Sequence, residues 1–329
     1  MGVYVGRAKS QCGEYVFGIG WGERVDEESV WYVEKHNLKT RMSAFIKLLA
    51  FSHDLGTMLA VFHKNNEFNS NMRIVDGWIY QSFGPVPEAV PPPPRLIDRD
   101  TGTILFELNG HVNNKVHSAV FAPDNTFVVT GSSDKTARIW SVAIGETIRV
   151  LDGHPDSVWC VAVSPDSRYV ATGSYQTVYV WSVDTGERVK TFNDLPWFAT
   201  CVAFSPDGNF LLAGSQYTVY VWSMETNEEI KKFTGHSSFV DEIIVSPDST
   251  WFATASHWDT YINRWDMNTT TKMNRLEVSH MITSLAVSPD GKSFAVASSY
   301  DGVRILDVET GDVVKTTTLQ HGMILNAVV

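Results

Sequence analysis

The chain has 329 residues, of which 43% are hydrophobic and 12% aromatic, enough for a sizeable buried core. Its 37 acidic residues outnumber its 26 basic ones, and the net charge of -11 argues against a nucleic acid as partner. The three cysteines, Cys12, Cys160 and Cys201, form no disulfide framework and indicate a reducing compartment. No apolar run approaches ~18 residues, and the first residues lack a signal-peptide core. We therefore expect a cytoplasmic protein, with the nucleus left open, that binds no membrane.

The first 42 residues contain three candidate strands, at 3–8, 14–20 and 29–35. The last residues, MILNAVV at 323–329, match the first strand of the repeat described below and then stop. We expect these four strands to form one composite sheet from residues 1–42 and 321–329. A sheet shared by the two ends of the chain would close a ring and leave no exposed strand edge.

The next sheet is expected to begin at Phe45, with strands in IKLLAFSHDLGTMLAVF and in RLIDRDTGTILFELNGH at 95–111. An insertion at about 64–92 separates its second strand from its third. Within the insertion, MRIV (72–75) and WIYQ (78–81) flank Asp76 and Gly77, a pair typical of a two-residue hairpin turn. Pro91 to Pro94 predict a stiff extended segment. Two interpretations stay open: a tolerated surface elaboration, or a lid or docking arm.

The rest of the chain repeats one pattern five times. A turn such as SPDS or SPDG recurs with its proline at regular intervals of 42, 41, 41 and 42 residues: Pro123, Pro165, Pro206, Pro247 and Pro289. Each copy also contains a later strand of similar sequence: ARIWS, VYVWS, VYVWS, INRWD and VRILD. Repeats of ~40 to 45 residues with four short strands each are typical of propeller blades. We place blades two to six at roughly 115–153, 156–194, 197–235, 238–279 and 281–319, after blade one at 45–111.

With these repeats the chain resembles the WD40 repeat β-propeller family over nearly its whole length. The resemblance implies an all-β fold and one closed domain, 1–329, with seven four-stranded antiparallel blades if the composite sheet is the seventh. Six or eight blades would need a different interpretation of the two ends. Family members share a buried relay of His, Ser or Thr, Asp and Trp whose role is structural. Two blades carry full candidate sets: His111, Ser132, Asp134, Trp140 and His236, Ser256, Asp259, Trp265. Blades three and four lack the Asp, and we expect their turns to be looser.

Enzyme signatures are absent from the sequence. It has no Gly-rich phosphate loop, HExxH motif, CxxC pair or nucleophile elbow. Of ten histidines, four occupy the repeated GH position or its equivalent, and the others form no spaced ligand set. Cys160 and Cys201 fall at equivalent places in adjacent repeats and are expected to be small buried hydrophobes. We expect no enzyme, no cofactor and no metal.

The resemblance also implies which residues face the top of the ring, at the entry to each first strand and in the turn between the second and third strands. Many of them are aromatic, and exposed rings favour a binding site, although some of them could pack under neighbouring loops. The candidate partner-binding residues are Phe45, Lys47, Lys115, His117, Trp159, Tyr175, Phe198, Phe239, Asp241, Trp258, Met281 and Tyr300.

The sequence thus favours a scaffold that binds a peptide or protein on an aromatic-rich top face, with its oligomeric state left open. A carbohydrate-binding, lectin-like propeller is the alternative, since aromatic faces also suit sugars. The rim residues differ from blade to blade, which argues against repeated sugar sites. An enzyme that uses the mouth of the central channel is the least favoured interpretation.

Overall fold

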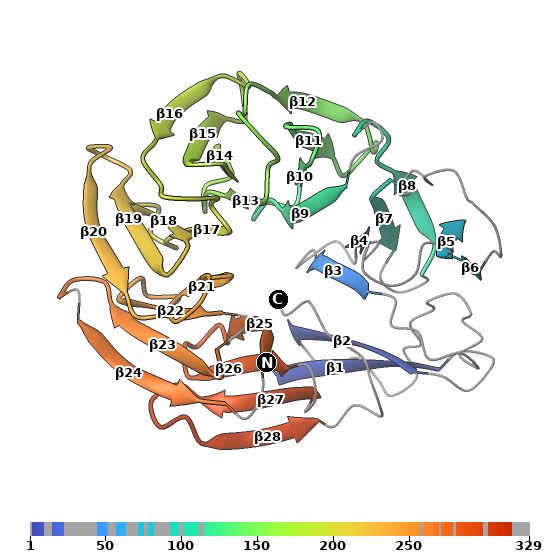
Figure 1. Ribbon diagram of the computed structural model, residues 1–329. Coiled ribbons are helices and arrows are strands. Elements are labelled where there is room, and N and C mark those ends of the chain that lie inside the picture. The colour runs from blue at the N-terminus through green and yellow to red at the C-terminus, as the bar shows by residue number, and fades with distance from the viewer. Residues whose placement is uncertain are drawn as a thin grey trace.

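The computed structural model describes residues 2–9, 15–22, 45–51, 57–63, 72–75, 78–81, 93–98, 102–111, 115–256, 259–269, 271–278, 281–298 and 302–317 (Figure 1). Before residue 93 it describes the backbone alone. All regular structure in these ranges is antiparallel β-sheet, and none of it is a helix long and apolar enough to cross a membrane. The sheets stand around a common centre like the blades of a propeller (Figure 1).

The N-terminal residues form a two-stranded sheet of β1 (Gly2–Lys9) and β2 (Tyr15–Gly22). In Figure 1 this pair lies between the last four-stranded sheet and β3 (Phe45–Phe51). The two strands coincide with two of the four strands predicted for the composite sheet. The other two, at 29–35 and 323–329, lie outside the described residues.

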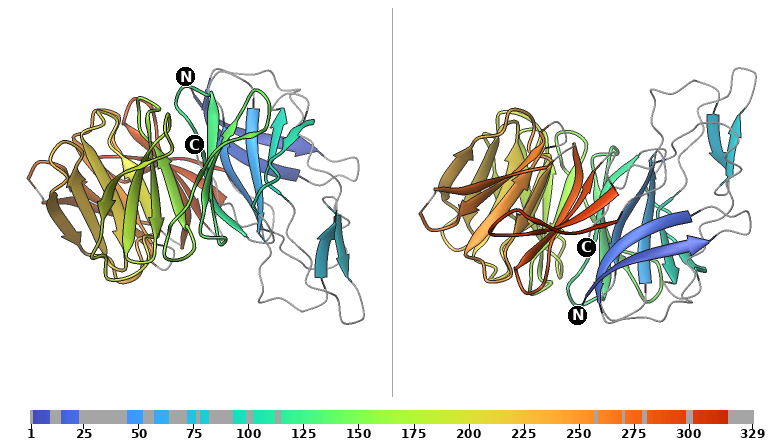
Figure 2. Two further views of the ribbon diagram at one scale, coloured as in Figure 1. Left: turned by 90° about the horizontal axis from the view of Figure 1, so that it is seen from above. Right: turned by 90° about the horizontal axis from the view of Figure 1, so that it is seen from below.

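Blade one contains a long connection between its second and third strands. Its sheet has the order β3, β4 (Thr57–His63), β7 (Arg95–Asp98) and β8 (Ile104–Glu107). β4 pairs directly with β7, despite the residues of the predicted insertion, 64–92, that separate the two strands in the sequence. These residues contain the hairpin strands β5 (Met72–Val75) and β6 (Trp78–Gln81), which both views in Figure 2 draw apart from the other sheets.

Five further four-stranded sheets follow in chain order. Blade two has β9 (Val116–Phe121), β10 (Phe127–Ser132), β11 (Ala137–Ser141) and β12 (Thr147–Leu151). Blade three has β13 (Cys160–Val163), β14 (Tyr169–Ser174), β15 (Thr177–Ser182) and β16 (Arg188–Phe192). Blade four has β17 (Cys201–Phe204), β18 (Phe210–Ser215), β19 (Thr218–Ser223) and β20 (Glu229–Thr234). Blade five has β21 (Glu242–Val245), β22 (Trp251–Ala255), β23 (Tyr261–Asp266) and β24 (Lys272–Glu277). Blade six has β25 (Ile282–Val287), β26 (Ser293–Ser298), β27 (Gly302–Asp307) and β28 (Val313–Thr317).

The repeated SPD turn folds as it does because its side chains bond its own backbone. In blade three, Ser164 Oγ donates to Asp166 Oδ1 at 2.6 Å and accepts from the backbone N of Tyr169 at 2.9 Å. The turn also needs a residue with positive φ, which is Ser167 at 58°. Blades four and six repeat the Ser–Asp bond. This turn joins the first strand of a blade to its second, and it recurs at the spacing from which we predicted the blades.

The core is divided among the spaces between neighbouring blades. Five buried clusters, each drawn from two adjacent blades, fill these spaces from blade one to blade six. Second strands are buried on both faces, so β10 is buried at all six positions and β22 at all five. Their sequences, FVVTGS and WFATA, accordingly do not alternate strictly between apolar and polar residues.

Blade five places a charge in one of these spaces. Arg264 is only 4% exposed, although the equivalent residue in blade three is the aliphatic Val180. Its guanidinium lies 4.6 Å from the ring centre of Trp251 and pairs with Glu309 Oε1 of blade six at 2.7 Å. This pair is a polar link between the two blades.

The described residues therefore form six four-stranded sheets and two two-stranded ones, the β1–β2 pair and the β5–β6 hairpin, where we predicted seven complete blades. The described residues do not show closure of the ring by strands from both ends, because two of the four strands that would make it lie outside them. The all-β class and the repeated antiparallel blades agree with the prediction.

Candidate functional site

The relay of blade two begins at His111, between an acidic turn and a buried tryptophan. Its Nδ1 lies 2.7 Å from Asp134 Oδ2, and its Nε2 lies 2.7 Å from Thr130 Oγ1. Trp140 Nε1 donates to the same Thr130 oxygen at 2.8 Å. Burial alone would raise the pKa of Asp134, but hydrogen bonds from His111 and Thr136 outweigh it and lower the pKa to about 2. The carboxylate is thus ionised at neutral pH.

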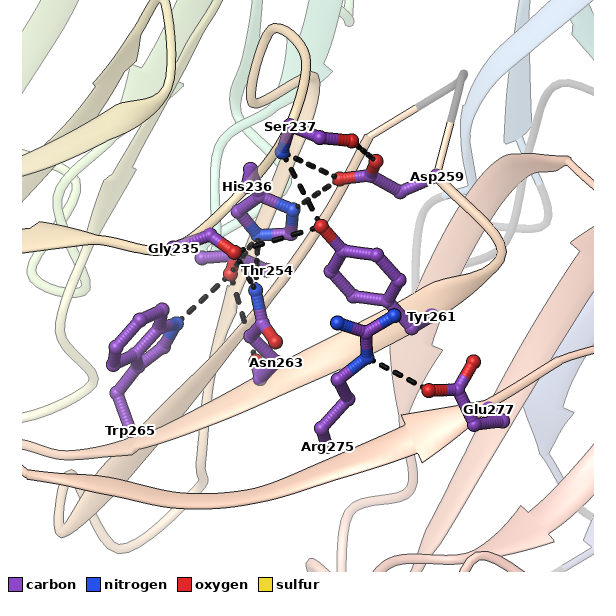
Figure 3. Close-up of polar contacts among 10 residues, drawn as sticks. All are labelled: Gly235, His236, Ser237, Thr254, Asp259, Tyr261, Asn263, Trp265, Arg275 and Glu277. Atoms are coloured by element: carbon purple, nitrogen blue, oxygen red, sulfur yellow. Dashed lines mark hydrogen bonds and ion pairs between the residues drawn. The ribbon is translucent and has the colours of Figure 1, made fainter.

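Blade five repeats this arrangement deeper in the protein (Figure 3). His236 Nδ1 lies 2.8 Å from Asp259 Oδ2, and His236 Nε2 lies 2.7 Å from Thr254 Oγ1, which accepts from Trp265 Nε1 at 2.9 Å. Ser237 Oγ also donates to Asp259. Burial would raise the pKa of Asp259, yet the bonds from Ser237 and His236 lower it below its ordinary value.

The same relay is braced from the outer strands. The ring of Tyr261 stacks on His236 with an interplanar angle of 8°, and Arg275 lies 3.4 Å from the centre of the Tyr261 ring (Figure 3). Asn263 Nδ2 lies 3.1 Å from His236 Nε2. An amide N–H and a threonine hydroxyl therefore both face Nε2, which is satisfied when Nδ1 carries the proton and Nε2 accepts. Burial lowers the pKa of His236, consistent with the neutral ring.

The hydroxyl of each relay differs from the one we predicted. Thr130 and Thr254 link histidine to tryptophan, whereas the prediction named Ser132 and Ser256, two residues further along the same strands. Ser132 stands at the end of β10, where its Oγ donates to the Lys115 carbonyl at 3.0 Å and accepts from the Asp134 backbone N at 3.2 Å. Strand side chains alternate, so both hydroxyls share one face, but only the earlier one reaches the tryptophan.

Thr130→Val is expected to lower the free energy of unfolding by about 2 kcal/mol, because it leaves the Trp140 N–H and His111 Nε2 buried without their shared partner. Ser132→Ala is the matched control, with an expected loss of about 1 kcal/mol for the bond to the Lys115 carbonyl. Urea unfolding followed by tryptophan fluorescence measures both. A larger loss of stability for Ser132→Ala than for Thr130→Val would indicate that Ser132, not Thr130, is the relay hydroxyl.

Blade three builds a relay without an acid. His154 Nδ1 lies 3.0 Å from the backbone carbonyl of Lys135 in blade two, and Nε2 lies 2.8 Å from Thr172 Oγ1, which accepts from Trp181 Nε1. The carbonyl takes the place of the missing carboxylate and links His154 to blade two, but it does not involve residues 174–177, the turn that we predicted to be looser. Burial lowers the pKa of His154 to about 4, while the Lys135 carbonyl opposes this shift and Arg188 adds to it.

Blade four replaces the relay with apolar packing. Leu195 and Ala213 occupy the positions of His154 and Thr172, and both are essentially fully buried. They pack with Trp222 in one cluster, where the tryptophan ring stacks on Phe192 with centroids 4.8 Å apart. Blade four therefore needs no carboxylate.

Bonds between neighbouring blades hold the loops of the top face, the side of the ring where first strands begin and second strands end. The residue that leads into a first strand donates its backbone N–H to the end of the preceding blade's second strand. The three pairs are Val158 N to Ser132 O at 2.9 Å, Ala199 N to Ser174 O at 3.0 Å and Val240 N to Gln216 O at 2.8 Å. Cys160 and Cys201, both buried, add S–H bonds of 3.3 Å to the carbonyls of Ala199 and Val240. Burial raises the pKa of the Cys201 thiol.

Five rings meet on this face, and we call His117, Trp159, Tyr175, Trp197 and Phe198 the rim cluster. His117 lies 4.1 Å from Trp159, and Trp159 meets Phe198 edge to face at 5.5 Å. Phe198 also meets Tyr175 at 5.0 Å and Trp197 at 5.5 Å, again edge to face. The cluster thus runs from blade two to blade four, and it brings together four of the predicted partner-binding residues.

Backbone and side-chain contacts hold the rim cluster in place, while two of its rings remain open to solvent. Tyr175 and Phe198 form a backbone bridge, and Gln176 N donates to Trp197 O at 3.0 Å. His117 Nε2 lies 2.6 Å from Ser133 Oγ. Even so, Trp159 is 38% exposed and Trp197 41% exposed. Large apolar rings that are held rigidly but left open to solvent are typical of an interaction surface.

The structure describes the side chains of only some of the other predicted partner-binding residues. Phe239 pairs with Tyr217, which is 49% exposed, at a centroid distance of 6.2 Å. Asp241, Lys115 and Met281 are each half-buried at the entry to a first strand. For Phe45 and Lys47 the structure describes only the backbone, in β3, while Trp258 and Tyr300 lie outside the described residues.

Trp197 was not among the predicted partner-binding residues. The prediction followed one register for all blades, in which the residue before the first strand's leading apolar position is Phe198. The signal that could have found Trp197 is the segment NDLPWF, which stands where other blades carry GH and a polar turn. A tryptophan in that polar position has no counterpart in the neighbouring blades.

The described residues offer little to a chemical reaction or a metal ion. Both ring nitrogens of His111, His154 and His236 are engaged inside the blades. Within the ranges that the structure describes, no three His, Cys, Asp or Glu side chains come together as a metal site would need. On the top face, Trp159 and Trp197 present exposed aromatic rings.

Comparison with known proteins matches this chain to two family models. The model described as WD domain, G-beta repeat matches residues 102–141, 145–182, 186–223 and 227–266. The model described as anaphase-promoting complex subunit 4 WD40 domain matches residues 252–327. The four matched repeats follow each other without a break larger than a few residues, as the blades do.

Individual relatives match over shorter stretches. WD repeat-containing protein 82 of Drosophila melanogaster is 38% identical over 81 residues, 24% of this chain and 26% of that protein. WD repeat and SOCS box-containing protein 1 of Danio rerio is 41% identical over 75 residues, 22% of this chain and 18% of its own length. Pre-mRNA-processing factor 19 homolog 2 of Arabidopsis thaliana is 40% identical over 85 residues, 24% of this chain and 15% of that protein. The matched segment thus spans about a quarter or less of each relative.

Proposed function

The chain belongs to the WD40 repeat family, and we propose that it is a non-enzymatic scaffold whose rim cluster binds a peptide or protein partner. WD40 repeats imply an interaction module, and the relatives' names place such repeats in different settings, one beside a SOCS box and one in a pre-mRNA-processing factor. The feature that this chain shares with these relatives is the WD40 repeat, which does not by itself specify a partner. The partner must therefore be inferred from the residues that are particular to this chain, which are those of the rim cluster.

The observation that carries the proposal is the continuous contact among five rings from three blades. Their backbone is fixed by the bonds between blades, so little conformational freedom remains to be lost when a partner binds. Aromatic residues at the centre of an interface commonly dominate its energy. The interior of the blades supports this reading, because the relay groups that resemble catalytic residues are already satisfied by one another.

A double substitution, Trp159→Ala with Trp197→Ala, is expected to weaken partner binding more than about tenfold, since central aromatic rings are each worth about 2 kcal/mol. Both side chains are open to solvent, so the melting temperature should change little. The measurement is the enrichment of a displayed random dodecapeptide library on the immobilised full chain, with calorimetry as the stability check.

Met273→Ala with Val314→Ala is the matched control, because these residues are 44% and 65% exposed but stand on the outer strands of blades five and six. It should leave peptide enrichment unchanged. Equal enrichment on all three proteins would contradict the proposal. Binding to a glycan array that is lost with the two tryptophans would instead support the lectin-like alternative.

A further inference from the structure

In the top-face loops from blade three to the start of blade five, every charged aspartate, glutamate, lysine or arginine side chain is an acid. Five loops build the top face from blade three to the start of blade five: residues 152–160, 174–177, 193–201, 215–218 and 234–242. They contain five carboxylates and no lysine or arginine: Asp152, Asp156, Asp194, Asp241 and Glu242. With 26 basic residues in 329, composition alone would put about three in these 35 positions. The aromatic surface therefore lies in a field of negative charge.

Blade two marks the edge of this field. Lys115 leads into β9, and Lys135 stands in the turn after β10, where its Nζ donates to the Pro155 carbonyl at 3.0 Å. His117, at the blade-two end of the rim cluster, is the ring nearest to these lysines in sequence. The top-face loops from blade three to the start of blade five thus carry carboxylates without lysine or arginine, while the blade-two border carries two lysines beside Asp134, which bonds His111.

We infer that the partner segment is basic, an extended peptide whose arginine or lysine side chains lie on Trp159 and Trp197 and whose neutral or acidic end points to blade two. The inference rests on the proposed function and names its partner class. Opposite charges raise the rate of encounter and exclude acidic competitors. A cation over an exposed aromatic face gains further energy from the ring.

The protein already uses this contact inside its own blades. The guanidinium of Arg188 lies 4.4 Å from the ring centre of Tyr179, and that of Arg275 lies 3.4 Å from Tyr261. In both cases the arginine and the ring belong to neighbouring strands of one sheet. The two open tryptophans present the same kind of face to solvent, and each follows an aspartate, Asp156 or Asp194, by three positions in the chain. A partner would supply the missing cation.

The test reads the sequences that the displayed dodecapeptide library yields on the full chain. We expect the peptides enriched by the wild type, and lost with Trp159→Ala and Trp197→Ala, to carry an excess of arginine and lysine over the starting library. A selected peptide should also bind more weakly as NaCl rises from about 50 to 300 mM, because screening shortens the range of the attraction.

Charge variants make the test specific. Asp156→Asn with Asp194→Asn keeps the shape of the loops, because asparagine retains an oxygen for the Ser157 N–H and tolerates the positive φ of 69° at residue 194. It should weaken binding of the selected peptide about three- to tenfold. Asp184→Asn with Glu225→Gln removes the same charge from the exposed turns on the opposite side and should change binding less than about twofold.

The outcomes separate the two proposals. Peptides that depend on the two tryptophans but carry no excess of arginine or lysine would overturn the basic-partner inference and leave the scaffold intact. Equal weakening by the two charge variants would overturn it as well. A selection that yields no peptide dependent on the tryptophans would overturn the proposed function itself.

Discussion

Asp259→Ala is expected to lower the free energy of unfolding by about 2–4 kcal/mol, because it leaves two buried donors without their acceptor. The side chain is 2% exposed and joins His236 to Ser237. Without it, the His236 Nδ1–H and the Ser237 hydroxyl both lose their acceptor in a site that excludes water. Urea unfolding at pH 7 measures the loss.

Asp134→Ala is the matched control, since it breaks the same bond in a more open relay. The Asp134 side chain is 14% exposed, so water can reach His111 once the carboxylate is gone. Its loss should be smaller than that of Asp259→Ala by at least about 1 kcal/mol. Equal losses would contradict the view that burial sets the strength of each relay.

Lowering the pH from 6.5 to 4 is expected to cost about 3 kcal/mol of stability through His154 alone. The folded ring has a pKa of about 4, below its ordinary value of 6.5. Between these two values the unfolded chain binds a proton that the folded chain refuses, so acid favours unfolding. Below pH 4 both states are protonated at this residue and it costs nothing further.

The carboxylates act in a different pH window. Asp134 has a folded pKa of about 2 against an ordinary 3.8, so its contribution is present above pH 3.8 and is lost as the pH falls through 2. His154→Leu, which copies Leu195 of blade four, should therefore flatten the stability profile between pH 6.5 and 4 and leave the fall below pH 4 intact. Burial also lowers the pKa of His236, which should leave a residual slope in the variant.

Urea midpoints measured at half-unit steps of pH test this prediction. The wild type should lose stability continuously from pH 6.5 to 4, and the variant should lose less over the same interval. Parallel profiles in the two proteins would show that His154 titrates at its ordinary pKa in the folded state. They would also contradict the burial of His154, which is what lowers its pKa.

Much of the fold could be predicted because each repeat contains a turn that depends only on residues close together in the sequence. The SPD turn needs a serine, an aspartate and a residue of positive φ at fixed offsets, so each first turn is visible in the sequence. Seven complete blades could not be predicted with the same support. The composite blade that we predicted would join segments hundreds of residues apart, and no local signal in the sequence indicates that they pair.

The relay residues could be predicted only in part, because the sequence does not show which side chains meet across the strands. The sequence offers two hydroxyls on one face of β10, Thr130 and Ser132, and a pattern cannot say which one meets the Trp140 N–H. In blade three it also could not reveal that the Lys135 carbonyl serves His154, because a backbone carbonyl leaves no mark in a sequence.

The rim cluster was partly predictable for a related reason. Trp159, Tyr175 and Phe198 follow from the register of single blades, each taken alone. Their meeting depends on the bridge between Tyr175 and Phe198, a contact between blades. Trp197 escaped because blade four departs from the repeat at that point.

The most direct test of the account is hydrogen–deuterium exchange of the full chain with and without a library-selected peptide. We expect the peptide to slow exchange in residues 156–160, 174–177 and 194–200, the backbone that carries Trp159, Tyr175, Trp197 and Phe198. Exchange in the outer strands β12, β16 and β20 should stay unchanged. Slowed exchange confined to those outer strands, with none in the three top-face segments, would show that the partner binds elsewhere.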